Sequence, residues 1–325
     1  MKVKSLAGVA LASLMLTIVA LVAPMSASAA LSWTAATTPS GTPNPTTVRS
    51  IANNGSGKLV AVGNSGSATK NVFVSTDGTT WTAYDSYNHP WVSVTYGSSK
   101  FVAVASDGAI MYSSNGTTWT MATSPSCAAA CIWNKVTYNA GYNTWVIAGY
   151  NSIPNNNLAK SSDGISWTLV TSSPQGDIKD VFNNNGYWYI IGVNGGTTIF
   201  QYTNGLNNPF TNYLTTPNGG GSAPSGIGTG GLNIAYSVGN LAILAGPAGF
   251  YVNTGSMYNN GWSGSASSPL TSSDVVGISR SSSTKWVMAA STGAIATSSD
   301  GITWTSATAI SSPGTVAGVT GSEGG

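Results

Sequence analysis

The chain has 325 residues, of which 42% are hydrophobic and only 6% are charged, with 11 Lys and Arg against 9 Asp and Glu. Disordered chains combine low hydrophobicity with high net charge, so this composition predicts a folded protein. Nucleic-acid binding needs a basic stripe that neutralises phosphates, and the near-zero net charge excludes that class of partner. We expect the surface to consist mainly of Ser, Thr, Asn and Gly.

The N-terminus has the three-part layout of a secretory signal. Lys2 and Lys4 precede an apolar run from Leu6 to Val22, and a small-residue cleavage site ends at Ala29. We expect residues 1–29 to be removed and the remainder to be secreted, periplasmic or held at the cell surface, without a membrane span. An uncleaved membrane anchor is the alternative, because the apolar run approaches membrane-spanning length.

A seven-residue box, Ser-x-Asp-Gly-x-x-Trp, recurs along the chain about every 46 residues. Asp-Gly between two strands is a strong hairpin signal, because Gly adopts positive φ and Asp bonds its own backbone. The Trp that ends the box buries a large ring. The residues assigned to this structural role are Asp77 and Trp81, Asn115 and Trp119, Asp163 and Trp167, and Asp300 and Trp304. Because Asn115 replaces the acid in one box, the boxes are predicted to be structural rather than catalytic.

Each period also carries short apolar runs that are separated by Gly, Asn and Asp turns. Four short strands per 40–50 residues predict an all-β propeller of four-stranded antiparallel blades. The six complete blades are expected at about residues 48–82, 91–120, 133–168, 178–211, 231–264 and 275–305. A partial seventh blade would join an N-terminal strand at 30–34 to a C-terminal strand within 315–325. Six blades that close with these extra strands patched on are the alternative.

The boxes resemble the Asp-box (BNR) repeats of sialidases, sortilin-type receptors, photosystem II assembly-factor propellers and xyloglucanase-type glycoside hydrolases. The resemblance covers nearly the whole chain after residue 29, and it implies the propeller fold but not one function. Sialidases hold the substrate carboxylate with three arginines and use a Tyr nucleophile assisted by a Glu. This chain has only Arg49 and Arg280, and its single glutamate, Glu323, lies in the C-terminal tail. Sialidase activity is therefore not expected.

Few titratable side chains lie outside the boxes, although catalysis usually needs them. Asp177 and Asp180 are weak catalytic candidates, because two suitably spaced carboxylates act as acid and base in glycoside hydrolases. The competing interpretation is a solvated strand start in which Lys179 pairs with Asp180. His89 is the only histidine, so we expect neither a metal site nor a cofactor.

The two cysteines, Cys127 and Cys131, lie four residues apart in a stretch that is predicted to be a loop. In an oxidising compartment this spacing favours a small local disulfide.

Aromatic residues gather at predicted strand starts and loops on one face of the propeller. The candidate ligand-binding residues are Tyr84, Tyr87, His89, Trp91, Trp133 and Tyr150. Aromatic rings beside Asn and Ser suit a sugar or a protein partner, whereas Trp91 and Trp133 could instead be packing between blades. The sequence favours a monomeric, non-enzymatic module that binds a glycan or an extracellular protein. A secreted glycoside hydrolase and an assembly factor for an exported or membrane complex are the alternatives.

Overall fold

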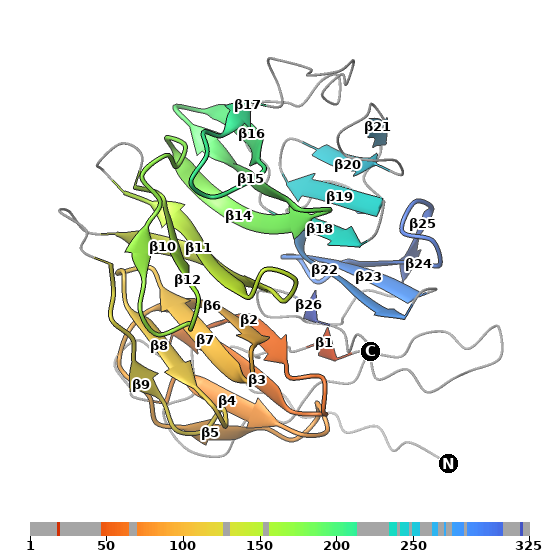
Figure 1. Ribbon diagram of the computed structural model, residues 1–325. Helices are drawn as coiled ribbons and strands as arrows, with labels where there is room; N and C mark the ends of the chain where they lie inside the picture. Colours follow the sequence, from red (N-terminus) through yellow and green to blue (C-terminus); the bar gives the residue numbers. More distant parts are fainter. Residues whose placement is uncertain are drawn as a thin grey trace, which may run out of the picture.

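The computed structural model describes residues 18–19, 47–64, 70–125, 131–151, 156–212, 234–238, 241–246, 249–253, 262–265, 270, 275–282, 285–307 and 319–320. Within these ranges every regular element is a β-strand (Figure 1). Among the same residues, no helix has the length and hydropathy needed to cross a membrane.

The described strands form six four-stranded antiparallel sheets, each made of four consecutive strands, which we call blades 1 to 6. Blade 1 contains β2 (Thr47–Asn53), β3 (Leu59–Asn64), β4 (Val72–Ser75) and β5 (Thr82–Tyr84). Blade 2 contains β6 (Trp91–Gly97), β7 (Lys100–Ala105), β8 (Ile110–Ser113) and β9 (Thr120–Met121). Blade 3 contains β10 (Ile132–Asn139), β11 (Thr144–Tyr150), β12 (Leu158–Ser161) and β13 (Thr168–Leu169).

Blade 4 contains β14 (Asp177–Asn184), β15 (Tyr187–Asn194), β16 (Thr197–Thr203) and β17 (Thr211–Asn212). Blade 5 contains β18 (Ile234–Val238), β19 (Leu241–Gly246), β20 (Gly249–Asn253) and β21 (Trp262–Ser265). Blade 6 contains β22 (Val275–Ser282), β23 (Lys285–Ala290), β24 (Ile295–Ser298) and β25 (Trp304–Ala307). The first strand of each blade contacts the first strand of the next, so that these strands line the centre of the ring (Figure 1). The predicted all-β propeller of four-stranded antiparallel blades is confirmed.

A further short strand, β26 (Val319–Thr320), lies between the first strands of blades 6 and 1. It contacts both β22 and β2 and pairs in parallel with β1 (Ile18–Val19). The described residues contain no four-stranded sheet at this position. The strand predicted at 30–34 lies outside the described residues, so the partial seventh blade stays a proposal.

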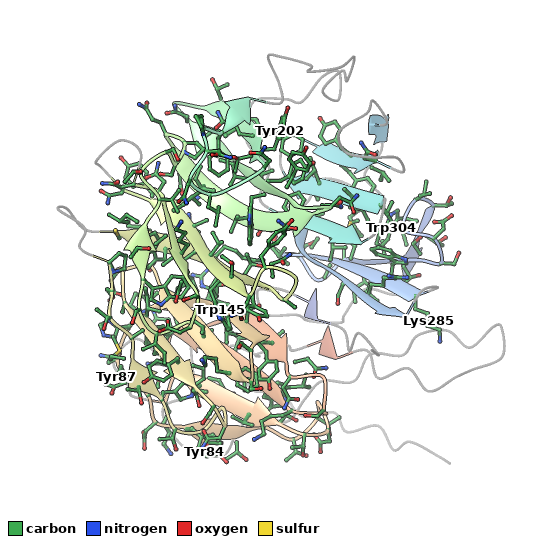
Figure 2. The ribbon with its side chains drawn as sticks, viewed as in Figure 1. Tyr84, Tyr87, Trp145, Tyr202, Lys285 and Trp304 are labelled. Atoms are coloured by element: carbon green, nitrogen blue, oxygen red, sulfur yellow. The ribbon has the colours of Figure 1, made fainter. Side chains whose placement is uncertain are left out.

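The core of the molecule lies between neighbouring blades. Val102 and Val104 of blade 2 are fully buried against Trp145 and Ile147 of blade 3, and Figure 2 shows Trp145 between these blades. A strand covered on both faces needs apolar side chains at successive positions, which explains the continuous apolar runs of the second strands. Each such side chain stabilises the fold by about 1.5–3 kcal/mol.

The box of blade 1 shows how the repeated turn holds its shape. The backbone N–H groups of Thr79 and Thr80 donate to Asp77 Oδ1 at 2.8 and 2.7 Å, and Gly78 N–H donates to Ser75 Oγ at 2.8 Å. Gly78 has φ +74°, a conformation that a residue with a side chain rarely adopts. Trp81 Nε1 donates to Gly78 O at 3.2 Å. All these hydrogen-bond partners lie within the turn, so these polar groups of the box are paired without a ligand.

The other three boxes repeat the backbone hydrogen bonds of this turn. Asn115 Oδ1 accepts the N–H groups of Thr117 and Thr118, both at 2.9 Å, and thus replaces the carboxylate. The rings of Trp119 and Trp304 also donate back to the box glycine. Trp167 is equally buried, although its Nε1 has no bonded partner among the described atoms. The boxes of Asp163 and Asp300 form the same backbone bonds.

Candidate functional site

Asp180, one of the two weak catalytic candidates, is buried on the innermost strand of blade 4. Its carboxylate accepts the N–H of Val181 at 2.8 Å and, from blade 5, the N–H of Ala235 at 3.0 Å. The Lys135 ammonium of blade 3 lies 3.4 Å from Asp180 Oδ1. Burial raises the pKa of Asp180, against the opposing effects of Lys135 and the two N–H groups. Asp180 therefore bonds three consecutive blades together.

The repeat explains why a carboxylate stands at this position. The first strands of blades 1 to 4 each contain a bulge, after which come Ser50, Ser93, Lys135 and Asp180 respectively. Ser50 Oγ accepts the N–H of Val94 in the next blade at 3.1 Å, and Ser93 Oγ accepts that of Val136 at 3.2 Å. Lys135 holds the equivalent position in blade 3, but a lysine cannot accept a hydrogen bond. The N–H of Val181 in blade 4 therefore donates to Asp180 instead. The Asp180 carboxylate thus accepts hydrogen bonds from the N–H groups of Val181 and Ala235, which is a structural role.

Asp177 has partners of its own. Lys179 Nζ forms an ion pair with Asp177 Oδ2, and Asn134 Nδ2 of blade 3 donates to Asp177 Oδ1 at 2.6 Å. The alternative in which Lys179 pairs with Asp180 is wrong, because Lys179 pairs with Asp177 and Asp180 instead faces Lys135 of blade 3. The Asp177 side chain is 37% exposed and that of Asp180 only 3%. The two carboxylates thus have different surroundings and different lysine partners.

Trp91 and Trp133 are packing residues and cannot stack on a ligand, since both are fully buried. Trp91 Nε1 donates to Tyr87 O at 2.9 Å, and Trp133 Nε1 donates to Gly108 O at 3.1 Å. Tyr84 is partly buried against the cluster that joins blades 1 and 2, and Figure 2 shows it at the end of β5. Trp91 and Trp133 thus pack beneath the exposed loops and are not themselves exposed.

The remaining predicted aromatic residues stay exposed on one face. We call this the upper face: it carries the loops between second and third strands and the connections between blades. The lower face carries the hairpins between first and second strands and the box turns between third and fourth strands. Tyr87, in the connection into blade 2, is 41% exposed, and Tyr150, at the end of β11 in blade 3, is also 41% exposed.

Two residues that the sequence does not single out for binding, Asp107 and Ile132, complete this surface. His89 Nδ1 lies 2.7 Å from Asp107 Oδ2, with the side chains 33% and 42% exposed, and the His89 ring meets Trp91 edge-on at 5.5 Å. Ile132 is 39% exposed and pairs with Tyr150 across β10 and β11. We define the upper patch as Tyr87, His89, Asp107, Ile132 and Tyr150.

Sequence alternation places Ile132 on the opposite face of β10 from the buried Trp133, but its exposure follows from its place at the end of the strand and not from the alternation. Asp107 lies in a turn with Gly108, and its side chain accepts the N–H of Ala109 at 3.3 Å. The bond between Asp107 and His89 joins two separate loops, and no local pattern in the sequence predicts it.

Blades 2 and 3 are tied together directly below the upper patch. Gly108, with φ +89°, lies so close to blade 3 that a Cβ there would be 2.9 Å from Cys131 O. Cys131 is buried and takes part in a disulfide. Cys127 lies outside the described residues, so its pairing with Cys131 stays a prediction. These contacts hold the two halves of the upper patch in fixed relation.

A second surface feature is an uncharged cavity of about 450 Å³ at blade 4. Its lining comes from the connection after blade 3 and from β15 and β16: Gln175, Asn194, Thr197, Thr198, Ile199 and Gln201. In the described ranges, no three His, Cys, Asp or Glu side chains are grouped so as to hold a metal ion.

No protein-family model and no curated protein sequence matches the chain. A solved structure of YCF48 bound to D1 peptide is 13% identical, with a TM-score of 0.57, and the match covers 80% of this chain and 81% of that one. The WD40 propeller domain of Doa1 is 13% identical, with a TM-score of 0.59 and coverage of 83% and 84%. Sqt1 from Chaetomium thermophilum is 12% identical, with a TM-score of 0.53 and coverage of 83% and 74%. At such low identity these similarities show the fold alone: this chain is a β-propeller.

Proposed function

We propose that this protein is an exported, non-enzymatic propeller that binds a protein partner through the upper patch. The observation that carries the proposal is that exposed apolar side chains are concentrated on the upper face. Of the five large hydrophobic residues that are exposed in the described ranges, three lie in the upper patch: Tyr87, Ile132 and Tyr150. Tyrosine is enriched in protein interfaces, because its ring supplies contact area and its hydroxyl a hydrogen bond.

The chemistry of the patch fits a protein partner better than a catalytic reaction. The His89–Asp107 pair adds polar groups beside the apolar residues, and protein interfaces combine an apolar centre with such a polar rim. The buried rings of Trp91 and Trp133 fix the loops from below, so that little ordering is needed on binding. YCF48 is a propeller that has been solved with a peptide bound, which supports this function by analogy of fold.

The test compares two surfaces of the same protein in its native host. The exported protein, tagged at its C-terminus, is crosslinked in place, and the crosslinked proteins are quantified by mass spectrometry. We expect the double variant Tyr87→Ala, Tyr150→Ala to lose a specific partner by at least about tenfold, as interface tyrosines often contribute 2 kcal/mol or more. Mass spectrometry of the same material should show an N-terminus at Ala30, as the predicted signal requires.

Tyr142→Ala is the matched control, because Tyr142 is 57% exposed in the lower-face hairpin of blade 3. It should leave the crosslinked partner unchanged. Equal loss in Tyr142→Ala, or no loss in the double variant, would overturn the assignment to the upper patch. If the partner is a subunit of an exported or membrane complex, the protein is an assembly factor of the kind that the sequence offers as an alternative.

Glycan binding is a second candidate function, favoured by the cavity at blade 4. The amides of Gln175, Asn194 and Gln201 and the hydroxyl of Thr197 face a space without charged groups, and such groups hydrogen-bond neutral sugars. A glycan array read with wild type and with Gln175→Ala separates this function from the first. Binding that is lost in Gln175→Ala but kept in the tyrosine double variant would place a sugar at the cavity and not at the upper patch.

A further inference from the structure

Tyr150 of the upper patch lies on the side of blade 3 that faces blade 4. Val146 and Ala148 of β11 are fully buried in the core cluster that joins these two blades. Alternate residues of a strand share a face, so Tyr150 continues the face of Val146 and Ala148 to the upper end of β11. Ile132 is the cross-strand partner of Tyr150 in β10. The blade 3 part of the upper patch is therefore directed towards blade 4.

The blade 4 cavity lies on the side of its blade that faces blade 3. Of the lining residues, Thr197, Ile199 and Gln201 alternate along β16 and so share one face of this strand. Ile199 belongs to the core cluster that joins blades 3 and 4, so this face is directed towards blade 3. The cavity is also on the upper face, because a hairpin between second and third strands and a connection between blades form it. Tyr150 and the cavity therefore flank the same boundary between blades.

A chain of buried hydrogen bonds joins these two features. Asn151, the first residue after β11, donates its backbone N–H to Asn157 Oδ1 at 2.8 Å. Asn157 donates its own N–H to Ser173 Oγ at 2.9 Å and its side-chain amide to Pro174 O at 2.7 Å. Asn151, Asn157 and Ser173 are at most 3% exposed. Such buried networks are rigid, so this one holds Gln175 of the cavity in fixed relation to the end of β11.

The charges on this part of the upper face are paired within the protein. The pairs are Asp107 with His89, Asp177 with Lys179, and Asp180 with Lys135. The cavity itself is lined by amides, hydroxyls and one isoleucine. A partner that carried a charge into this cavity would lose hydration there without gaining a counter-ion, which is costly. Charge complementarity therefore favours a partner segment that is itself uncharged.

We propose that the upper patch and the blade 4 cavity form one binding site for an extended, uncharged peptide segment of the partner. An apolar side chain of the segment lies on Tyr150 and Ile132. A neutral polar side chain, Asn or Gln, enters the cavity and bonds the amide of Gln175. Extended segments are recognised in this way because their side chains occupy separate pockets. The inference rests on the proposed function, since it names the kind of partner that the upper patch binds.

Selection from a displayed library of random peptides, about twelve residues long, on the exported protein tests the inference. We expect the enriched peptides to lack charged residues and to share an apolar residue at a fixed spacing from an Asn or Gln. One enriched peptide is then synthesised as the probe. Its Kd should change less than about twofold between about 50 and 500 mM NaCl, because salt screens charge pairs and the complex forms none.

Variants of the protein show whether the peptide reaches both features. Tyr150→Ala and Gln175→Ala should each weaken binding of the synthetic peptide at least about tenfold. Replacing the peptide's own Asn or Gln by Ala should weaken binding to wild type but not weaken binding to Gln175→Ala further, because the two groups bond each other. Gln175 is exposed, so its truncation should leave Tm unchanged. Thr82→Ala, at an exposed position of β5, is the control and should change neither binding nor Tm.

Three outcomes would overturn the inference. The first is a selection that enriches no peptide, or charged ones. The second is a peptide whose binding is weakened in Tyr150→Ala but not in Gln175→Ala, because the cavity would then lie outside the site. The third is glycan-array binding that is lost in Gln175→Ala, because a sugar would then occupy the cavity. The proposed function fails separately, if the double variant Tyr87→Ala, Tyr150→Ala keeps its crosslinked partner.

Discussion

Single polar side chains decide how the inner strands of neighbouring blades are joined. Serine serves one backbone donor of the next blade at Ser50 and Ser93. Lys135 cannot accept a hydrogen bond from the next blade. Asp180 accepts two backbone N–H groups instead, and its carboxylate also faces the Lys135 ammonium. A carboxylate has enough acceptor sites for three donors, whereas a hydroxyl does not. The most buried acidic residue of the described chain is thus explained by its neighbour on the preceding blade.

We predict that Asp180→Ala destabilises the protein by about 2–4 kcal/mol, because it leaves the buried N–H of Val181 and the partly buried N–H of Ala235 without their acceptor. Urea unfolding followed by tryptophan fluorescence measures the change. Asp177→Ala removes a carboxylate that is 37% exposed and should cost less than about 1 kcal/mol. Comparable losses in the two variants would contradict the assigned roles.

The box turns of blades 2 and 6 each fix their blade against the one before it. The box glycine combines a left-handed conformation with close contact: Gly116 has φ +78°, and a Cβ there would lie 2.7 Å from Val60 of blade 1. Gly301 has φ +77° and would meet Leu241 of blade 5 at 2.6 Å. Glycine is therefore needed in these boxes for two reasons: the turn requires a positive φ, and the preceding blade leaves no room for a Cβ.

Gly116→Ala is predicted to destabilise the protein by about 2–4 kcal/mol, the sum of a strained φ and a clash in a packed interface. Gly195→Ala is the control, since Gly195 also has positive φ, +57°, but a Cβ added to it would have no neighbour within 4 Å. It should cost only about 1 kcal/mol. Thermal unfolding of both variants separates the two contributions, and equal costs would mean that the contact with Val60 is unimportant.

The stability of the whole molecule depends on pH through the carboxylates of its boxes. Backbone N–H groups in the boxes hold the pKa of Asp77 and Asp300 below the usual value. Burial opposes the shift at Asp163, but the N–H groups of Ser166 and Ile165 still lower the pKa of that carboxyl. A lowered folded pKa gives stability that is present above the unfolded pKa, about 4, and is lost as the pH falls. The pKa of Asp180 is raised, so the contribution of this residue to stability changes with pH in the opposite direction.

We therefore predict that Tm falls between pH 5 and pH 2, since three box carboxylates outnumber one buried aspartate. Asn115 makes the same bonds without titrating, which gives an internal comparison. Asn115→Asp should steepen the fall of Tm with acid, and Asp77→Asn should reduce it, each by a few degrees. Calorimetry at pH 7, 5, 3 and 2 measures these slopes. Parallel curves for the three proteins would contradict the role of the box carboxylates.

The sequence by itself determined the class of fold. Asp-Gly turns, apolar second strands and box tryptophans act locally or against an identical neighbour, so one repeat contains the information for its own blade. Turn geometry depends on residues two or three positions apart, such as Asp77 and Thr80. For the same reason the four boxes are recognisable from the order of their residues alone.

Only the tertiary structure decided which side chains share a surface or a partner. Trp91 and Trp133 are as aromatic as Tyr87 and Tyr150, yet the first pair is buried and the second exposed. Asp180 finds Lys135 and Ala235 across two blade boundaries, at sequence separations that no local pattern encodes. Likewise, His89 meets Asp107 only because two loops converge on the upper face. Such contacts depend on how the blades are placed around the ring, which the repeat within one blade does not specify.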